Sequence, residues 1–178
     1  MRRVDCKEAG VGRSSRNFAR VGTQRVAYLD QTGSGNETAA HLRADGRLTL
    51  MFCAFEGAPQ ILRLYGKGTV LLRRSQEYAE MLASVFGGVE PPGARQIEKL
   101  QVDLVMKSCG YGVPLFDFAG ERATLRRWAE AKGEEEIEAY WRRKNVASID
   151  GLPTGILDLV GDTQSGPAGS DPCAVPNP

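Results

Sequence analysis

The sequence predicts a mainly β fold with peripheral helices, and three observations carry that prediction. Segments rich in apolar, β-branched and aromatic residues recur at residues 26–30, 47–56, 60–72 and 97–106. Helical patterns lie between and after these segments. A loop of glycine and hydroxyl residues joins the first strand to the first helix. Elements that alternate in this way suit a small β-barrel decorated with helices.

Composition indicates one globular domain. The chain has 178 residues, 42% of them apolar and 25% charged, which is close to the average for soluble proteins. Its formal net charge of +1 leaves no excess charge to attract nucleic acid or an anionic membrane. The sequence also lacks an apolar run of about 18 residues and a hydrophobic signal region. We therefore expect a cytoplasmic protein with no nucleic-acid or membrane partner.

The loop between the first strand and the helix at residues 36–44 is a candidate phosphate site. Thr32-Gly33-Ser34-Gly35-Asn36 offers exposed backbone N–H groups and hydroxyls. A helix N-terminus carries partial positive charge and unpaired N–H donors, so both would stabilise a phosphate at residues 34–38. The alternative is structural, because Ser34 and Glu37 also have the spacing of a capping box. The loop in isolation supports the two interpretations equally.

The next two strands form a predicted hairpin. Residues 57–59 make its tip, and the return strand at 60–72 contains Gly66 and Gly68. Interior glycines indicate a bulge, a bend at a barrel corner or the close approach of a ligand. Residues 48–55 are apolar at both odd and even positions, so both faces of this strand should be covered. The barrel interior would cover one face, and a second subunit is the simplest cover for the other.

A helix and a strand follow the hairpin. Ser75 is the predicted N-cap of a helix that ends near Phe86. Its apolar stripe predicts core packing and consists of Tyr78, Leu82, Val85 and Phe86. The strand at residues 97–106 should place alternate apolar side chains on one side of the sheet. These are Leu100, Val102, Leu104 and Met106.

The C-terminal part combines helices with a polar tail. Residues 120–145 predict a charged helical pair broken near Gly133, with its charged residues forming a solvated surface. The predicted buried face consists of Leu125, Trp128, Ile137, Tyr140 and Trp141. Residues 163–178 contain four prolines and no aromatic residue, too little apolar surface to offset the entropy of ordering. We place the start of a disordered tail at residue 154.

Cysteine and histidine usage predicts no metal site. The four cysteines are far apart, without a CxxC pair, and the chain has one histidine, His41. We expect no disulfide in a reducing compartment and interpret Cys53 as a small buried hydrophobe. Cys109, beside glycines and an aromatic residue, is a weaker candidate for a functional thiol. We assign no catalytic residue, because no partner that would orient His41 is legible in the sequence.

Three stretches closely resemble one known family. They are residues 28–68, which contain TGSGNET, residues 106–114, which contain CGYGVP, and residues 145–153, NVASIDGLP. Together they resemble the pyridoxamine 5'-phosphate oxidase-like, FMN-binding split-barrel family, and in particular its bacterial pyridoxamine 5'-phosphate oxidase-related branch. The resemblance covers residues 25–153. It implies a split β-barrel and a homodimer with FMN at the subunit interface. Residues 1–24 then form an N-terminal arm, which is either disordered or a replacement strand.

The resemblance also implies a function and a set of cofactor-binding residues. Family chemistry belongs to the flavin, so the implied protein is an FMN-dependent oxidoreductase acting on a small organic substrate, such as a B6 vitamer or a deazaflavin-linked compound. The substrate itself is not readable. Ser34, Asn36 and Thr38 match by position the phosphate-binding turn of the family. The full set of candidate cofactor-binding residues is Thr32, Ser34, Gly35, Asn36, Glu37, Thr38, Arg63, Tyr111 and Arg16.

Structural alternatives stand beside several of these residues. Arg63 equally fits a surface cross-strand pair, and Thr38 fits a plain helical threonine. Tyr111 lies between glycines that a tight packing turn would also require. Arg16 would replace the usual phosphate cation of the family, whereas a solvated arm explains it without a ligand.

The N-terminus departs from the family pattern. Family members usually carry a helix and two barrel strands before the segment equivalent to residues 25–30, and the arm here does not offer two convincing strands. A barrel without its first strands exposes unpaired edges and opens a wall of the flavin site. Dimerisation covers the gap, or the true start lies further upstream, or the chain has lost flavin. In the last case it is a non-catalytic dimeric protein that binds flavin or another small ligand.

Overall fold

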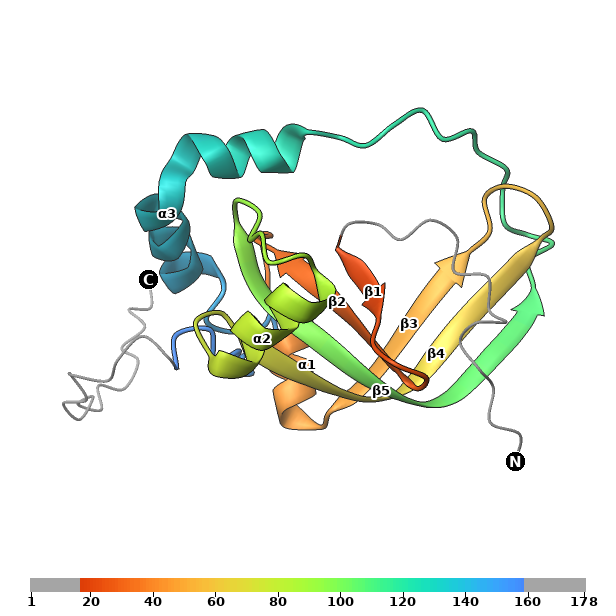
Figure 1. Ribbon diagram of the computed structural model, residues 1–178, viewed down its shortest axis with the longest axis horizontal. Helices are drawn as coiled ribbons and strands as arrows, with labels where there is room; N and C mark the ends of the chain where they lie inside the picture. The colour runs from red at the N-terminus through yellow and green to blue at the C-terminus, as the bar shows by residue number, and fades with distance from the viewer. Residues whose placement is uncertain (1–16, 159–178) are drawn as a thin grey trace, which may run out of the picture.

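The computed structural model describes residues 17–158, and they fold around one five-stranded antiparallel sheet of order β1-β2-β5-β4-β3 (Figure 1). In chain order the elements are β1 (Phe18–Arg20), β2 (Arg25–Gln31), α1 (Glu37–Ala44), β3 (Arg47–Cys53), β4 (Gln60–Leu72), α2 (Gln76–Val85), β5 (Ala94–Cys109) and α3 (Thr124–Lys144). The predicted mainly β class with peripheral helices is confirmed. The sheet is open, with β1 and β3 at its edges, and its split-barrel form stays a prediction.

The predicted elements are all present, with small differences at their ends. β4 has the predicted bounds, and α1 begins one residue later than expected. β1, paired with β2, lies inside the predicted N-terminal arm, whose residues 1–16 are outside the described part of the chain. The start of the predicted tail packs on the domain, because the buried Thr154 donates its hydroxyl to the Asn145 carbonyl at 2.6 Å.

A bulge in the β4–β5 pairing changes which residues of β5 face the core. The register shifts at Tyr65/Gly66, where Gly66 pairs with Val102 and Tyr65 pairs with Leu104. A one-residue shift moves the following side chains to the other face. The prediction that alternate residues from Leu100 to Met106 share one face is therefore wrong. Leu100 and Val102 are buried, whereas Leu104 and Met106 are exposed.

The two interior glycines of β4 are explained by packing. A Cβ on Gly66 would lie 1.9 Å from the carbonyl oxygen of Gln101, so the bulge requires glycine there. A Cβ on Gly68 would lie 2.5 Å from Cδ2 of Leu42 in α1. Gly68 thus lets α1 approach the sheet closely. The predicted bulge therefore accounts for Gly66, whereas the close approach at Gly68 is that of α1 and not of a ligand.

Apolar clusters lie on both faces of the sheet. One face carries a core of Val26, Leu62, Leu64, Leu100 and Val102, with Phe18, Leu48, Leu50, Phe52 and Val105 packed against it. α2 covers part of the other face, where it packs near Ala27, Leu29 and Ile97 (Figure 1). The predicted cap is confirmed, because the Ser75 hydroxyl accepts from the N–H of Tyr78 at 3.1 Å. α2 therefore contributes to the core, as its stripe predicts.

β3 is covered on one face only within the described chain. Leu48, Leu50 and Phe52 pack on the core, whereas Met51 points the other way and is 57% exposed. Figure 1 shows no helix over this end of the sheet, where β3, β4 and the end of β5 lie side by side. The expected second cover on β3 is therefore not provided by the described residues, and a second subunit on that face stays a prediction.

α3 is the predicted helical pair. Its backbone is non-helical at Gly133, where φ is 70° and ψ is 175°, so two helices meet at a kink. Ile137 and Trp141 are buried as predicted, and the rings of Trp128 and Tyr140 are in contact. Leu125 is 41% exposed, so its predicted burial is wrong. No helix between residues 17 and 158 combines the length and apolar character needed to cross a membrane.

Candidate functional site

A cleft opens where β2 gives way to α1. It has a volume of about 710 Å³ and lies between the loop before α1, the start of β5 and the segment that follows α3. The lining residues are Asp30, Gly33, Ser34, Gly35, Asn36, Glu37, Thr38, Arg95, Glu98, Lys144, Ala147, Ser148 and Ile149. Five of the predicted cofactor-binding residues, Ser34 to Thr38, therefore share one wall. A volume of this size is typical of small-molecule sites.

The start of α1 faces this cleft without a side-chain cap. Asn36 is the N-cap residue, and its side chain makes no capping hydrogen bond. The capping-box alternative is wrong, because the Glu37 carboxylate instead accepts the N–H of Ile149 at 3.0 Å. The N–H groups of the first helical turn are consequently not satisfied by a side chain. Ser34 is exposed beside them.

Thr32 lies beneath the loop and serves as an anchor for it. Its Oγ1 accepts from Nε1 of Trp141 at 2.8 Å and donates to the carbonyl of Gly93 at 2.9 Å. The side chain of Asn145 donates to the carbonyl of Gly33 at 3.1 Å. Trp141 of α3 and Asn145, which follows α3, thereby fix the position of the loop. Thr32 is buried and positions the loop instead of facing the cleft opening.

Asn36 is also engaged with the protein. Its side-chain oxygen accepts from Nε2 of Gln96 at 2.7 Å, and its Nδ2 donates to Oε1 of Gln96 at 3.4 Å. Nη1 of Arg95 donates to the carbonyl of Gly35 at 2.7 Å. These contacts bind the loop to β5. They shape the rim of the cleft. The free hydrogen-bond donors of the rim are then the backbone N–H groups at the start of α1.

A buried ion pair forms part of the wall. Arg95 contacts Asp30 through Nε at 2.7 Å and Nη2 at 2.6 Å, and Nη1 also donates to Oδ1 of Asn145 at 3.0 Å. Burial raises the pKa of the Asp30 carboxyl, and the charge of Arg95 opposes that rise. The guanidinium is therefore occupied by internal partners. Lys144, exposed at the rim, is the cleft cation without such a partner in the described chain.

The most buried titratable group of the cleft is Glu98. It is 1% exposed, and burial, followed by the nearby charge of Asp30, raises its pKa to about 8. Tyr28 pairs with Glu98 across β2 and β5, and burial also raises the pKa of its hydroxyl. At neutral pH the side chains of Glu98 and Tyr28 are thus both mainly uncharged.

Sequence reasoning missed Arg95, Glu98 and Lys144. The signal for the first two was present, since ARQIE at residues 94–98 places three polar side chains at the start of an apolar strand. Charged side chains in a central strand are rarely buried unless they are paired. Only the strand order places β5 in the centre of the sheet, between β2 and β4. Lys144 was hidden among the many charges of α3.

Arg63 and Tyr111 are not brought to the cleft within one chain. Arg63 donates to the Ser108 hydroxyl at 3.0 Å and pairs in register with Met51 and Met106, on the exposed face of the sheet. Tyr111 follows the C-terminal end of β5 and is 84% exposed. A Cβ on Gly110 would lie 2.6 Å from the backbone N of Gln60, so a packing turn explains that glycine. Arg16 lies outside the described residues.

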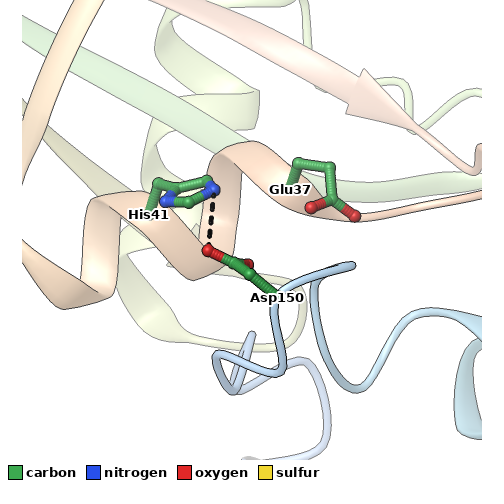
Figure 2. Close-up of side chains that lie close together, drawn as sticks. All are labelled: Glu37, His41 and Asp150. Carbon is green, nitrogen blue, oxygen red and sulfur yellow. Dashed lines mark ion pairs between the residues drawn. The ribbon is translucent and has the colours of Figure 1, made fainter.

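Three side chains gather where residues 148–150 meet α1. Figure 2 shows Glu37 and His41 on the helix and Asp150 on the facing loop. Their potential ligand atoms lie within 4.8 Å of one another, and Nε2 of His41 is 3.9 Å from Oδ2 of Asp150. All three are exposed, and Glu37 also accepts the N–H of Ile149. We interpret this group as a contact that docks the cleft wall on α1, with Asp150 as the His41 partner not legible in the sequence.

The described cysteines form no disulfide. Cys53 is half-buried on the outward-facing side of β3, so it is less buried than predicted. Cys109 is exposed at the end of β5. Neither lines the cleft. Cys6 and Cys173 lie outside the described residues.

The chain is similar to a protein of known family. It is 36% identical over 165 residues to the pyridoxamine 5'-phosphate oxidase family protein ustO of Aspergillus flavus, a match that covers 85% of this chain and 65% of that protein. The chain thus spans just under two thirds of its relative's length. No family model matches the sequence, and no solved structure matches it.

The fold and the cleft define a mainly β protein with a cleft of small-molecule size at the start of a helix. The similarity confirms the family that the motifs indicate: the chain belongs to the pyridoxamine 5'-phosphate oxidase family. Its TGSGNET motif forms the loop and first turn that line the cleft. What the cleft binds is a separate question from family membership.

Proposed function

We propose that the chain binds FMN through its phosphate at the start of α1 and acts as an FMN-dependent oxidoreductase of the pyridoxamine 5'-phosphate oxidase-related type on a small organic substrate. The observation that carries this proposal is the uncapped helix start that opens into the cleft. Backbone N–H donors and the helix dipole favour an anion at such a position.

The residues around the helix start fit a phosphate group. The hydroxyl of Ser34 and the first-turn N–H groups would donate to its oxygens, and Lys144 would supply the positive charge. Thr38 lines the same wall and also hydrogen bonds with the Tyr28 side chain. Glu37 bears negative charge nearby, but its carboxylate is directed at the Ile149 N–H. Donors therefore outnumber free acceptors where the phosphate would lie.

Bound FMN supplies hydride transfer through its isoalloxazine ring, so the protein needs to bind and orient it. The contacts of Thr32 and Asn145 would hold the phosphate loop in one geometry. The Arg95–Asp30 pair would fix the position of β5 against that loop. The side chains that line the cleft then act by positioning, which is consistent with a site where no protein nucleophile is assigned.

A homodimer is part of the proposal. The uncovered face of β3, β4 and β5 carries Met51, Leu104 and Met106, with exposed fractions of 57%, 51% and 40%. Adjacent exposed apolar side chains of this kind are typical of interaction surfaces. A second copy seated there would cover the outer face of β3. It would also give Arg63, which lies among these residues, a place at a subunit interface.

A second candidate function is a non-catalytic dimeric protein that binds flavin or another small ligand. The observation that favours it is the internal use of the cleft side chains. Asn36 and Arg95 both have protein partners, so little in the described wall is free to act on a substrate. His41, the one histidine, pairs with Asp150 in an exposed group.

One experiment tests both functions. The purified chain is mixed with FMN and examined for retained yellow colour and a thermal shift; at about one hundred times the dissociation constant, bound ligand adds roughly 2.7 kcal/mol of stability. We expect Ser34→Ala and Lys144→Ala to weaken binding. Arg47→Ala, an exposed change outside the cleft, is the matched control. A colourless protein without a shift would contradict the flavin assignment.

Turnover separates the enzyme from the carrier. Steady-state oxidation of reduced nicotinamide is followed in the presence of FMN. Turnover supports the oxidoreductase, and bound flavin without turnover supports the carrier. Affinity that is unchanged in both Ser34→Ala and Arg63→Ala also favours the carrier.

A further inference from the structure

Glu98 has an unused hydrogen-bonding atom in the wall of the cleft. Its Oε1 accepts from Nε2 of Gln96 at 2.7 Å. Its Oε2 is buried and has no hydrogen-bond partner within the described chain. Leaving a buried polar atom unpaired is unfavourable, so such an atom in the wall of a cleft calls for a partner outside the protein.

Every element packed around Glu98 contributes to its environment. Tyr28 and Asp30 face it from β2, and Val70 pairs with it from β4. Gln96 and Arg95 lie on its own strand, β5. Thr38 of α1 hydrogen bonds to Tyr28, and Lys144 lines the same cleft as Glu98. Glu37, the other carboxylate of the lining, is bonded to the Ile149 N–H.

These neighbours decide which carboxyl holds a proton. Arg95 contacts Asp30 directly and leaves Glu98 without a cationic hydrogen-bond partner. Two neighbouring carboxyls in unlike environments separate into an ionised one and a neutral one. Burial, with the charge of Asp30 adding to it, raises the pKa of Glu98 to about 8. The neutral form therefore predominates at pH 7, and its O–H is a donor.

We propose that Glu98 is a ligand-binding residue of this cleft, donating a hydrogen bond from Oε2 to an acceptor oxygen or nitrogen of the bound molecule. This inference rests on the proposed function, in which that molecule is FMN. The acceptor belongs either to the phosphate or to the ring and its ribityl chain. In both cases the cleft offers a second donor, separate from the α1 start, and so selects ligands rich in acceptors.

The proposal predicts a pH dependence of affinity. Above the pKa of Glu98 the carboxylate loses its donor and gains a charge that repels an acceptor. The dissociation constant of FMN should rise toward tenfold for each pH unit above about 8. Glu98→Gln retains an N–H donor at every pH, so its dissociation constant should stay within about twofold from pH 6.5 to 9.5. The other groups of the cleft are the same in both proteins, so their effect on binding cancels in the comparison.

The test measures FMN binding to the full chain and to Glu98→Gln by flavin fluorescence across that pH range. Circular dichroism verifies folding at each pH, and carbon-13 NMR of the glutamate carboxyls follows the ionisation of Glu98 with and without FMN. We expect divergent pH profiles and a rise in the pKa of Glu98 on binding. Parallel profiles, with FMN bound to both proteins and no change in the Glu98 titration, would overturn the inference and leave the proposed function intact. Absence of FMN binding to either protein at pH 7 would overturn the proposed function and this inference with it.

Two further probes identify the acceptor. Riboflavin lacks the phosphate, and inorganic pyrophosphate lacks the ring. A divergent profile with riboflavin supports donation to the ring or the ribityl chain, and one with pyrophosphate supports donation to phosphate. Equal profiles of the two proteins with FMN and both probes would overturn the proposal.

Discussion

Nη2 of Arg95 lies 2.6 Å from Oδ2 of Asp30, and the same guanidinium bonds to the carbonyl of Gly35. One cation thus joins β2, β5 and the loop before α1. The Arg95 side chain is 6% exposed and that of Asp30 is 19% exposed, so the pair is shielded from water. Removing one partner of such a pair is more damaging than removing both.

Arg95→Ala should lower the free energy of unfolding by about 3–5 kcal/mol, because it leaves the partly buried Asp30 carboxylate without its cation. Urea denaturation measures the change. The double variant Arg95→Ala/Asp30→Asn should recover a large part of the loss. Arg47→Ala, which breaks an exposed pair with Asp45, should leave stability nearly unchanged. An equal loss in the single and double variants would show that the ion pair is not the cause.

Trp141→Phe should weaken FMN binding and lower stability by about 1–2 kcal/mol, since Thr32 loses the indole N–H that anchors the loop. Thermal unfolding and flavin fluorescence measure the two effects. Trp128→Phe is the matched control, because its edge contact with Tyr140 requires only a ring. If both variants behave alike, the anchor has no special role.

Glu98→Gln should change how stability depends on pH. The folded-state pKa of Glu98 is raised to about 8, above its unfolded value of about 4.3, so its contribution is fully present below pH 4 and is lost as pH rises toward 8. Relative to the natural chain, Glu98→Gln should therefore gain stability with rising pH, at up to about 1.4 kcal/mol per unit. Urea midpoints at pH 5, 7 and 9 measure this. A constant difference across the three would contradict a raised pKa.

Gly68→Ala should cost about 1–3 kcal/mol, because the new methyl group would overlap Leu42 and push α1 from the sheet. Chemical denaturation reports the loss, and FMN affinity should fall with it as the helix start moves. Gly112→Ala introduces the same group where nothing lies within 4 Å, and it should be neutral. Equal costs at the two positions would exclude the steric explanation.

Met51→Asp should dissociate the proposed homodimer by placing a charge on the apolar outer face of β3. Sedimentation velocity at several concentrations measures the oligomeric state. Val89→Asp, at another exposed apolar residue with a 76% exposed fraction, should leave the dimer intact. A natural chain that sediments as a monomer at all concentrations would remove the interface proposal.

Local chemistry in the sequence accounts for most of the fold. The bounds of β4, the Ser75 cap of α2 and the break at Gly133 follow from strand propensity, capping and glycine conformation, which act over a few residues. The family also follows from the motifs, because the long TGSGNET and CGYGVP stretches are specific. The alternation in β5 predicts the wrong face after Val102, since a bulge depends on the partner strand.

By itself, then, the sequence determined the β class, the order of elements, the family and the loop that faces the cleft. Tertiary structure decided which polar residues of that loop are free: it bonded Asn36 to Gln96, directed Glu37 to Ile149 and brought Arg95 and Glu98 into the wall. The physical reason is that exposure and ionisation depend on neighbours up to about a hundred residues away, as between Thr32 and Trp141. No local pattern encodes such a contact until the strands are placed side by side.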